Sequence, residues 1–185
     1  MTQPFATPEP TRFSDDEVDR YARQLVLAEI GGPGQQALKR ARVLIVGLGG
    51  VGAPAALYLA AAGVGTLGLI DDDAVALSNL QRQIIFAATD VGRPKVEAGA
   101  AHLASLNAHV AVEALRERLT PDNAGALIQR FDVVLDGTDD FDTRSAVNAG
   151  WGAGEGAGLG AQAVASAIRG RTRTPLRNDM KYSKN

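Results

Sequence analysis

Short apolar runs recur along most of the chain. Each is four to six residues long and is followed by a glycine or a charged residue, which predicts buried β-strands covered on both faces. The runs span residues 43–46, 66–70, 110–115 and 133–136.

Amphipathic or alanine-rich stretches lie before and between these runs and predict helices. They cover residues 15–29, 35–40, 53–62, 94–106 and 121–130, with a further helix from about Asp142. Because parallel strands that alternate with helices are joined by right-handed crossovers, the expected fold class is α/β. The chain should form a Rossmann-like, doubly wound, mostly parallel sheet with an N-terminal helix.

Local signals set the limits of three of these helices. Ser14 and Glu17 have the spacing of a capping box, which predicts the start of the first helix. The Gly-Gly-Pro-Gly sequence of residues 31–34 predicts a break before the short second helix. Thr120 followed by Pro121 predicts another helix start.

The uncharged stretch from residue 43 to residue 70 is long enough to cross a bilayer. Glycines and Pro54 interrupt it and three aspartates follow it, so a strand, a turn, a helix and a second strand explain it better. Residues 1–13 contain prolines and no apolar core of a signal peptide, and we expect a flexible leader there. We therefore expect a cytoplasmic protein with no membrane partner.

The composition excludes several kinds of chemistry. The 185 residues are 45% apolar and 22% charged with a net charge of −2, which fits a soluble globular protein and does not favour a nucleic-acid partner. Cysteine is absent, so this chain carries no disulfide, no cysteine zinc site and no cysteine nucleophile. His102 and His109 lack metal-ligand spacing and are expected to be structural.

The end of the chain differs from the rest. Residues 14–149 carry the strand–helix alternation and are expected to form one domain. Residues 150–185 contain seven glycines and six basic residues against two acidic ones, and predict a Gly/Arg-rich, atypical tail.

A glycine-rich turn follows the first predicted strand. Gly47, Gly49 and Gly52 form G-x-G-x-x-G between that strand and a helix, where the backbone can approach a phosphate. Asp71 ends the second strand, where a carboxylate of this fold accepts the hydroxyls of a ribose. The alternatives are a simple tight turn and a solvated strand end. An NAD-dependent oxidoreductase explains these features equally well.

Later residues distinguish a triphosphate from a dinucleotide. Arg82 and Lys95 are cations expected near the carboxyl edge of the sheet, where they would neutralise the β- and γ-phosphates of a triphosphate. The carboxylates within residues 136–140 could hold Mg²⁺ against phosphate oxygens. Taken singly, these residues are also explained as surface cations and turn formers.

Five motifs in order resemble the ThiF/MoeB family, the bacterial relatives of ubiquitin-activating enzymes. The match is close from Arg20 to about Asn148, and the Leu-Ser-Asn-Leu-Gln-Arg-Gln run is its most specific part. The motifs occupy residues 20–24, 42–52, 77–83, 92–95 and 136–140.

The resemblance implies a reaction. A family member binds Mg·ATP and the C-terminal Gly-Gly of a ubiquitin-like sulfur carrier protein, in a thiamine or molybdopterin type of sulfur pathway. The terminal carboxylate attacks the α-phosphorus, so that an acyl-adenylate forms and pyrophosphate leaves. The resemblance also implies a homodimer, and residues 14–149 are then the ATP-binding domain.

The resemblance further implies roles for individual residues. Gly50 lies against the nucleotide, Asp71 holds the ribose, Asp139 helps to place Mg²⁺, and Arg23 reaches the ATP of a partner subunit. The implied catalytic residues are Arg23, Arg82, Lys95 and Asp139. The implied nucleotide-binding residues are Gly47, Gly49, Gly50, Gly52, Asp71, Ser78, Asn79, Arg82, Lys95, Asp139 and Asp140.

The chain departs from the family in its last part. Without cysteine it lacks the family's zinc ligands and sulfur-relay cysteine, so no zinc is expected. The family's C-terminal strands, which cradle the tail of the carrier, are expected to be missing after about residue 149. We interpret residues 150–185 as a frame-shifted or otherwise altered end. A non-catalytic nucleotide-binding remnant is therefore an alternative function.

Overall fold

The computed structural model describes residues 12–138, 143 and 145–147. The described residues form one sheet of four parallel strands in the order β3-β2-β1-β4. The strands are β1 (Arg42–Val46), β2 (Thr66–Ile70), β3 (Ala111–Leu115) and β4 (Val133–Asp136). The predicted Rossmann-like α/β fold is confirmed.

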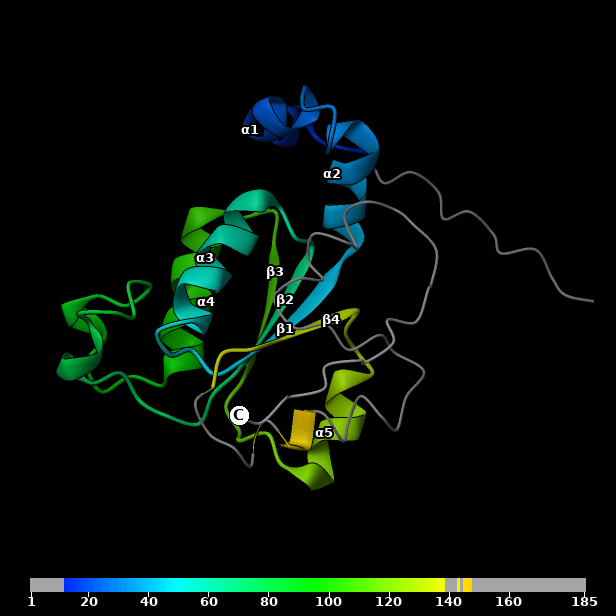
Figure 1. Cartoon of the computed structure of the whole chain (residues 1–185). Helices are drawn as coiled ribbons and strands as arrows, with labels where there is room; N and C mark the ends of the chain where they lie inside the picture. Colours follow the sequence, from blue (N-terminus) through cyan, green and yellow to red (C-terminus); the bar gives the residue numbers. More distant parts are fainter. Residues whose placement is uncertain (1–11, 139–142, 144, 148–185) are drawn as a thin grey trace, which may run out of the picture.

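Helices cover both faces of this sheet. Figure 1 shows α3 and α4 against one face and α5 against the other. The helices are α1 (Asp15–Leu25), α2 (Gly31–Arg40), α3 (Gly52–Ala62), α4 (Lys95–Leu106) and α5 (Pro121–Ile128), with short 3₁₀ helices η1 (Leu77–Asn79) and η2 (Ala88–Asp90) between β2 and α4.

Alternate residues of each strand enter two separate cores. Ile45 and Leu69 point into the core beneath α3 and α4, while Leu44 and Ile70 point into the core beneath α5. Because successive side chains of a strand face opposite sides, a strand with both faces covered must be apolar throughout. The continuous apolar runs of the sequence have this cause.

The strand order places a crevice at the carboxyl ends of β1 and β4. From β1 the chain passes through α3 to β2 on one side, whereas β4 pairs with the other side of β1. Helix α3, which follows β1, covers one face of the sheet, and α5, which precedes β4, covers the other. Ligands of doubly wound folds bind at such a switch point.

Two predicted helix limits were wrong. Helix α2 begins at Gly31, so the Gly-Gly-Pro-Gly sequence forms its first turn instead of a break. Proline is tolerated there because an N–H group of the first turn has no partner within the helix. Helix α1 ends at Leu25, where the N–H of Leu27 bonds to the carbonyl of Gln24, four residues before the predicted end at residue 29. The capping box of Ser14 and Glu17 is confirmed.

Helix α1 is fixed at the amino ends of the strands. Tyr21 is buried against Gly63, and its hydroxyl accepts a hydrogen bond from Asn107 Nδ2 at 2.8 Å. Gln24 Nε2 donates to the carbonyl of Ala62, the last residue of α3, at 3.3 Å. Since α3 begins at the carboxyl edge of the sheet and runs back across it, α1 lies at the edge opposite to the crevice.

Several expectations concern parts of the chain that lie outside the described residues. They include most of the leader, the start of the helix from Asp142 and the tail of residues 150–185. Of the predicted leader, Arg12 and Phe13 are described, and both contact Lys39, whose Nζ lies 3.1 Å from the Arg12 carbonyl. Across the described ranges no helix has both the length and the apolar character that a bilayer span requires.

Candidate functional site

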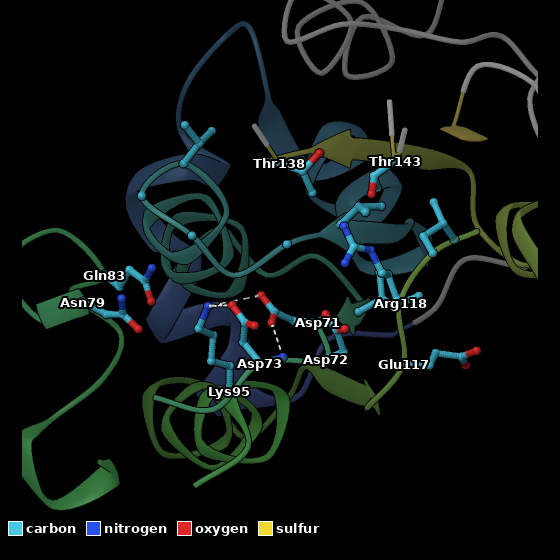
Figure 2. A pocket seen from close by; sticks show the side chains of 18 of the residues that line it. Asp71, Asp72, Asp73, Asn79, Gln83, Lys95, Glu117, Arg118, Thr138 and Thr143 are labelled. Atoms are coloured by element: carbon cyan, nitrogen blue, oxygen red, sulfur yellow. Dashed lines mark hydrogen bonds and ion pairs between the residues drawn. The ribbon is translucent and has the colours of Figure 1, made fainter. Parts of the chain in front are cut away.

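A cleft of about 540 Å³ opens at the carboxyl edge of the sheet, above β1 and β4. Figure 2 shows Asn79 and Gln83 on one side of it, Arg118 and Thr143 on another, and Asp71 and Lys95 between them. Most contributing segments follow the end of a strand or begin a helix, as expected at a switch point, while Asn79, Arg82 and Gln83 come from the segment between β2 and α4.

The glycine turn after β1 forms one wall of this cleft. Gly47 has a φ of 82°, which favours glycine, and a Cβ on Gly52 would lie 1.9 Å from the carbonyl oxygen of Gly47. Gly49 and Gly50 face the cleft instead. In the part of the chain that the structure describes, no side chain caps the start of α3, which leaves its first turn available to an anion.

The carboxylate of Asp71 connects this turn to the end of β2. Its Oδ2 accepts a hydrogen bond from the Leu48 N–H at 2.7 Å, and its Oδ1 accepts one from the Asp73 N–H at 2.9 Å. Burial raises the pKa of Asp71 above its ordinary value, although these hydrogen bonds and the Lys95 ammonium oppose the rise. Asp71 is therefore fixed in place at the edge of the cleft.

Lys95 is a buried cation at the same edge. It is only 4% exposed, and its Nζ lies 2.7 Å from Asp73 Oδ2 and 3.8 Å from Asp71 Oδ2 (Figure 2). Lys95 is also the first residue of α4, where the helix dipole disfavours a positive charge. The two carboxylates compensate this cost and hold the ammonium beside the cleft.

The segment of residues 76–91, here called the arm, leaves the body of the domain between β2 and α4. Asn79 and Arg82 of the arm line the cleft. Asn79 Oδ1 accepts a hydrogen bond from the Ala76 N–H at 3.1 Å, which fixes its amide. A Cβ built on Gly50 would lie 3.4 Å from Arg82 Cδ, so the arginine side chain lies across the glycine turn.

Most of the predicted residues within the described ranges meet at this cleft. Gly52 lies behind the turn, and Ser78 does not line the cleft; its carbonyl accepts a hydrogen bond from Arg82 Nη1 at 3.3 Å. Arg23 is exposed on α1 at the opposite edge of the sheet. Asp139 and Asp140 lie outside the described residues. The lining residues that the sequence predicted are Gly47, Gly49, Gly50, Asp71, Asn79, Arg82 and Lys95.

Other lining residues were not predicted. Arg118 follows the end of β3, and the rule that strand ends line the crevice could have found it. Gln83 is 3% exposed, and its Oε1 has no hydrogen-bond partner among the described residues. Thr138 follows β4, and its hydroxyl donates to Asp136 Oδ1 at 2.6 Å. Among the described residues, the polar residues that line the cleft and were not predicted are Asp72, Gln83, Glu117, Arg118, Thr138 and Thr143.

The acidic side of the cleft fits a hard cation by its chemistry. One oxygen each of Asp71, Asp72 and Asp73 lies within 4.8 Å of the others, and Mg²⁺ prefers carboxylate oxygens. Two of the three carboxylates already neutralise Lys95, however. The predicted magnesium residue, Asp139, is not among them and remains a prediction.

Comparison with known proteins agrees with this geometry. The ThiF family model matches residues 21–167, past the domain end predicted at residue 149. The chain is 52% identical over 137 residues to the sulfur carrier protein ThiS adenylyltransferase of Escherichia coli (strain K12), covering 74% of this chain and 55% of that protein. It is 50% identical over 136 residues to the probable adenylyltransferase/sulfurtransferase MoeZ of Mycobacterium tuberculosis (strain CDC 1551 / Oshkosh), covering 74% and 35%.

A solved structure shares the fold. The structure of the E. coli tRNA N6-threonylcarbamoyladenosine dehydratase TcdA in complex with ATP superposes with a TM-score of 0.70 at 31% identity, covering 74% of this chain and 56% of that chain. The chain thus spans between about a third and just over half of the relatives it matches. The family match covers most of the sequence, and the chain belongs to the ThiF family.

Proposed function

We propose that this protein uses ATP to adenylate the C-terminal Gly-Gly carboxylate of a ubiquitin-like sulfur carrier protein. The observation that carries the proposal is the cleft, which combines a glycine turn, the fixed carboxylate of Asp71 and the cations Arg82 and Lys95 at the switch point of the sheet. The E. coli relative is named as an adenylyltransferase of the sulfur carrier ThiS, and this favours adenylation over an NAD-dependent oxidoreductase. The cellular location expected for such a reaction is the cytoplasm.

The cleft offers a place for each part of ATP. The phosphates would lie on the glycine turn and the start of α3, with the ribose on Asp71 and the base towards the ends of β2 and β3 beside Arg118. Arg82 and Lys95 would then face the β- and γ-phosphates, together with the Asn79 amide. The TcdA structure in complex with ATP supports nucleotide binding by this fold.

The reaction needs alignment and neutralisation of charge more than covalent help from the protein. A carboxylate oxygen of the carrier attacks the α-phosphorus; the new P–O bond forms while the bond to pyrophosphate breaks. Arg82 and Lys95 would stabilise the charge that gathers on the leaving pyrophosphate. Mg²⁺ would neutralise further phosphate charge, and we propose that Asp139 and Asp140 lie on its side of the nucleotide.

A second subunit would complete the site. Arg23 lies at the amino edge of the sheet, whereas the cleft lies at the carboxyl edge, so Arg23 does not reach the cleft of its own chain. We propose that it contacts the ATP of a partner copy in a homodimer. Loss of Arg23 would then reduce activity without altering the cleft of the same chain.

Asp71 predicts a dependence of ATP binding on pH. Its raised pKa means that the carboxylate is protonated at a higher pH than an ordinary aspartate, and a protonated carboxyl accepts ribose hydroxyls less well. We expect the affinity for ATP, measured by calorimetry, to fall as the pH is lowered, and the fall to begin at a higher pH than the titration of an ordinary aspartate would cause.

Protonation of Asp71 does not lower the affinity for ATP by unfolding the protein. A folded-state pKa above the unfolded value adds stability at low pH, and that contribution disappears as the pH rises through the folded pKa. Binding and this stability contribution therefore change in opposite directions. The control is Asp71→Asn, which should bind weakly with a flatter pH profile; an unchanged profile would assign the effect to another group.

Carrier-dependent ATP–pyrophosphate exchange tests the proposed function. Wild type should catalyse exchange between ATP and pyrophosphate when a thiamine-type or a molybdopterin-type carrier ending in Gly-Gly is present. Arg82→Ala and Asp139→Ala should each reduce this exchange by about 100-fold. Arg40→Ala, which removes an exposed cation at the end of α2, is the matched control.

Each other outcome has a definite meaning. Exchange that neither Arg82→Ala nor Asp139→Ala reduces would refute the site. If the protein binds ATP but catalyses no ATP–pyrophosphate exchange in the presence of either carrier, the non-catalytic nucleotide-binding alternative is favoured.

A further inference from the structure

The arm leaves and rejoins the domain through a hydrogen-bonded neck. The Val75 N–H donates to the carbonyl of Arg93 at 2.9 Å, and the Gly92 N–H donates to the carbonyl of Val75 at 2.8 Å. One step closer to the cleft, the Lys95 N–H donates to the carbonyl of Asp73 at 3.0 Å. The backbone that places Lys95 is thus continuous with the base of the arm.

Apolar contacts anchor part of the arm beyond this neck. Ile85 and Phe86 are buried in the core beneath α3 and α4, but Leu77 and Ile84 are 71% and 62% exposed. Arg82, which lies across the glycine turn, is itself exposed. The burial of Ile85 and Phe86 leaves this arginine itself at the surface, so the polar contacts that hold the arm also contribute to its position.

The strongest of these contacts gather on the carboxylate of Asp90, where the arm returns. Asp90 is 2% exposed and accepts hydrogen bonds from the Ala87 N–H at 2.9 Å and from Arg93 Nη1 at 2.6 Å. Its Oδ2 lies 2.6 Å from Nε2 of His102. The Ala87 hydrogen bond, followed by the His102 contact, lowers the pKa of Asp90, so the carboxylate is ionised at neutral pH and the imidazole N–H is the donor.

His102 connects this carboxylate to the phosphate side of the cleft. It lies on α4, two turns after Lys95, so one rigid helix carries both the cation of the cleft and the donor that holds the arm. Ala87 and Arg93 belong to the arm and its neck, whereas His102 is the donor to Asp90 from α4. It is a hydrogen-bonded contact through which the helix can fix the returning arm, in addition to the packing of Ile85 near Gly99.

We infer that His102 is a positioning residue: through Asp90 it holds the arm against α4 and so keeps Arg82 in register with Lys95 across the cleft. This role goes beyond the structural histidine that the sequence predicted. The inference depends on the proposed function only for the identity of the ligand, because the order of the arm can be measured without one.

Hydrogen exchange of the arm tests the inference in the free protein. In His102→Leu, the amides of Val75, Ala87 and Gly92 should exchange about tenfold faster, while the amides of β1 and α5 should keep their protection. His102→Gln keeps an N–H donor and should restore most of the protection. His109→Leu, which changes the other histidine of the chain at an exposed position, is the control and should leave the arm unchanged.

Binding of Mg·ATP gives a second readout that a merely structural role would not produce. His102→Leu should weaken binding about five- to tenfold in the wild-type background and have little effect in an Arg82→Ala background, because it acts through that arginine. Uniformly faster exchange in His102→Leu, unchanged arm exchange, or an equal loss of affinity in both backgrounds would refute the inference. If wild type binds no ATP, the proposed function fails, but the exchange experiment still decides the role of His102.

Discussion

Replacing Lys95 with glutamine is expected to weaken the binding of Mg·ATP by about 100-fold while the chain stays folded. Lys95 is almost fully buried, and its ammonium lies between the carboxylates of Asp71 and Asp73 at the edge of the cleft. Glutamine keeps most of the side-chain volume and a hydrogen-bond donor but removes the charge. The variant therefore tests the charge itself.

The location of Lys95 shows why a ligand role explains it better than stability does. A cation in the first turn of α4 is opposed by the helix dipole, and burial of the ammonium adds a desolvation cost. Asp73 is largely exposed, so its ion pair alone returns little energy. A triphosphate bound on the glycine turn would give the ammonium a stronger partner than either carboxylate.

The measurement pairs calorimetry of Mg·ATP binding with denaturant unfolding. We expect Lys95→Gln to lower the free energy of unfolding by about 1–3 kcal/mol, because Asp71 loses a buried cationic neighbour. Lys39→Gln is the matched control, since Lys39 makes a 2.7 Å ion pair with buried Glu17 far from the cleft. Lys39→Gln should be less stable than wild type but bind Mg·ATP with the same affinity. If Lys95→Gln also bound Mg·ATP with wild-type affinity, Lys95 would not be part of the nucleotide site.

The features that could be predicted from sequence are those fixed by short-range patterns. The strands that begin at Arg42 and Val133 were predicted from their apolar runs, because the central positions of a strand covered on both faces are apolar. The turn at Gly47 and Gly52 is likewise local, since its backbone leaves no room for a Cβ. Asp71 followed from its place at the end of the next strand.

The features that were missed depend on which segments the fold brings together. Nothing near Lys95 in the sequence shows that Asp73, 22 residues away, would neutralise it. Arg118 lines the cleft although it follows β3, which β2 and β1 separate from β4 in the sheet. Ser78 was predicted to bind the nucleotide because it belongs to the same motif as Asn79 and Arg82. Adjacent side chains of a turning segment point in different directions, however, and Ser78 does not line the cleft. Partners across the fold cannot be read from spacing along the chain.

Replacing Gly52 with alanine is expected to destabilise the protein by about 3 kcal/mol and to abolish measurable binding of ATP. The added Cβ would lie 1.9 Å from the carbonyl oxygen of Gly47 and 3.2 Å from Ile45 Cγ2. The closest of these atoms belongs to the backbone, which cannot turn aside as a side chain can. The start of α3 would have to move away from β1, and the phosphate-binding turn would open.

Two other glycines separate loss of the fold from loss of the site. In Gly49→Ala the added Cβ meets one atom of the described residues within 4 Å, the carbonyl oxygen of Gly137 at 3.6 Å. This variant should fold normally but bind ATP weakly, because the new methyl group faces the cleft. In Gly125→Ala of α5 the added Cβ meets no described atom within 4 Å, and the variant should keep both properties or gain about 0.5–1 kcal/mol of stability.

Denaturant unfolding and calorimetry of ATP binding on the three variants then show whether each glycine is needed for folding, for binding or for neither. If Gly52→Ala folds with wild-type stability, the turn can relax, and the close packing of α3 on β1 is not what makes glycine necessary there. If Gly49→Ala instead binds ATP as wild type does, the phosphates do not approach the backbone at that residue. The glycine turn would then organise the sheet edge without touching the nucleotide, and the phosphates would have to rest on Arg82 and Lys95 alone.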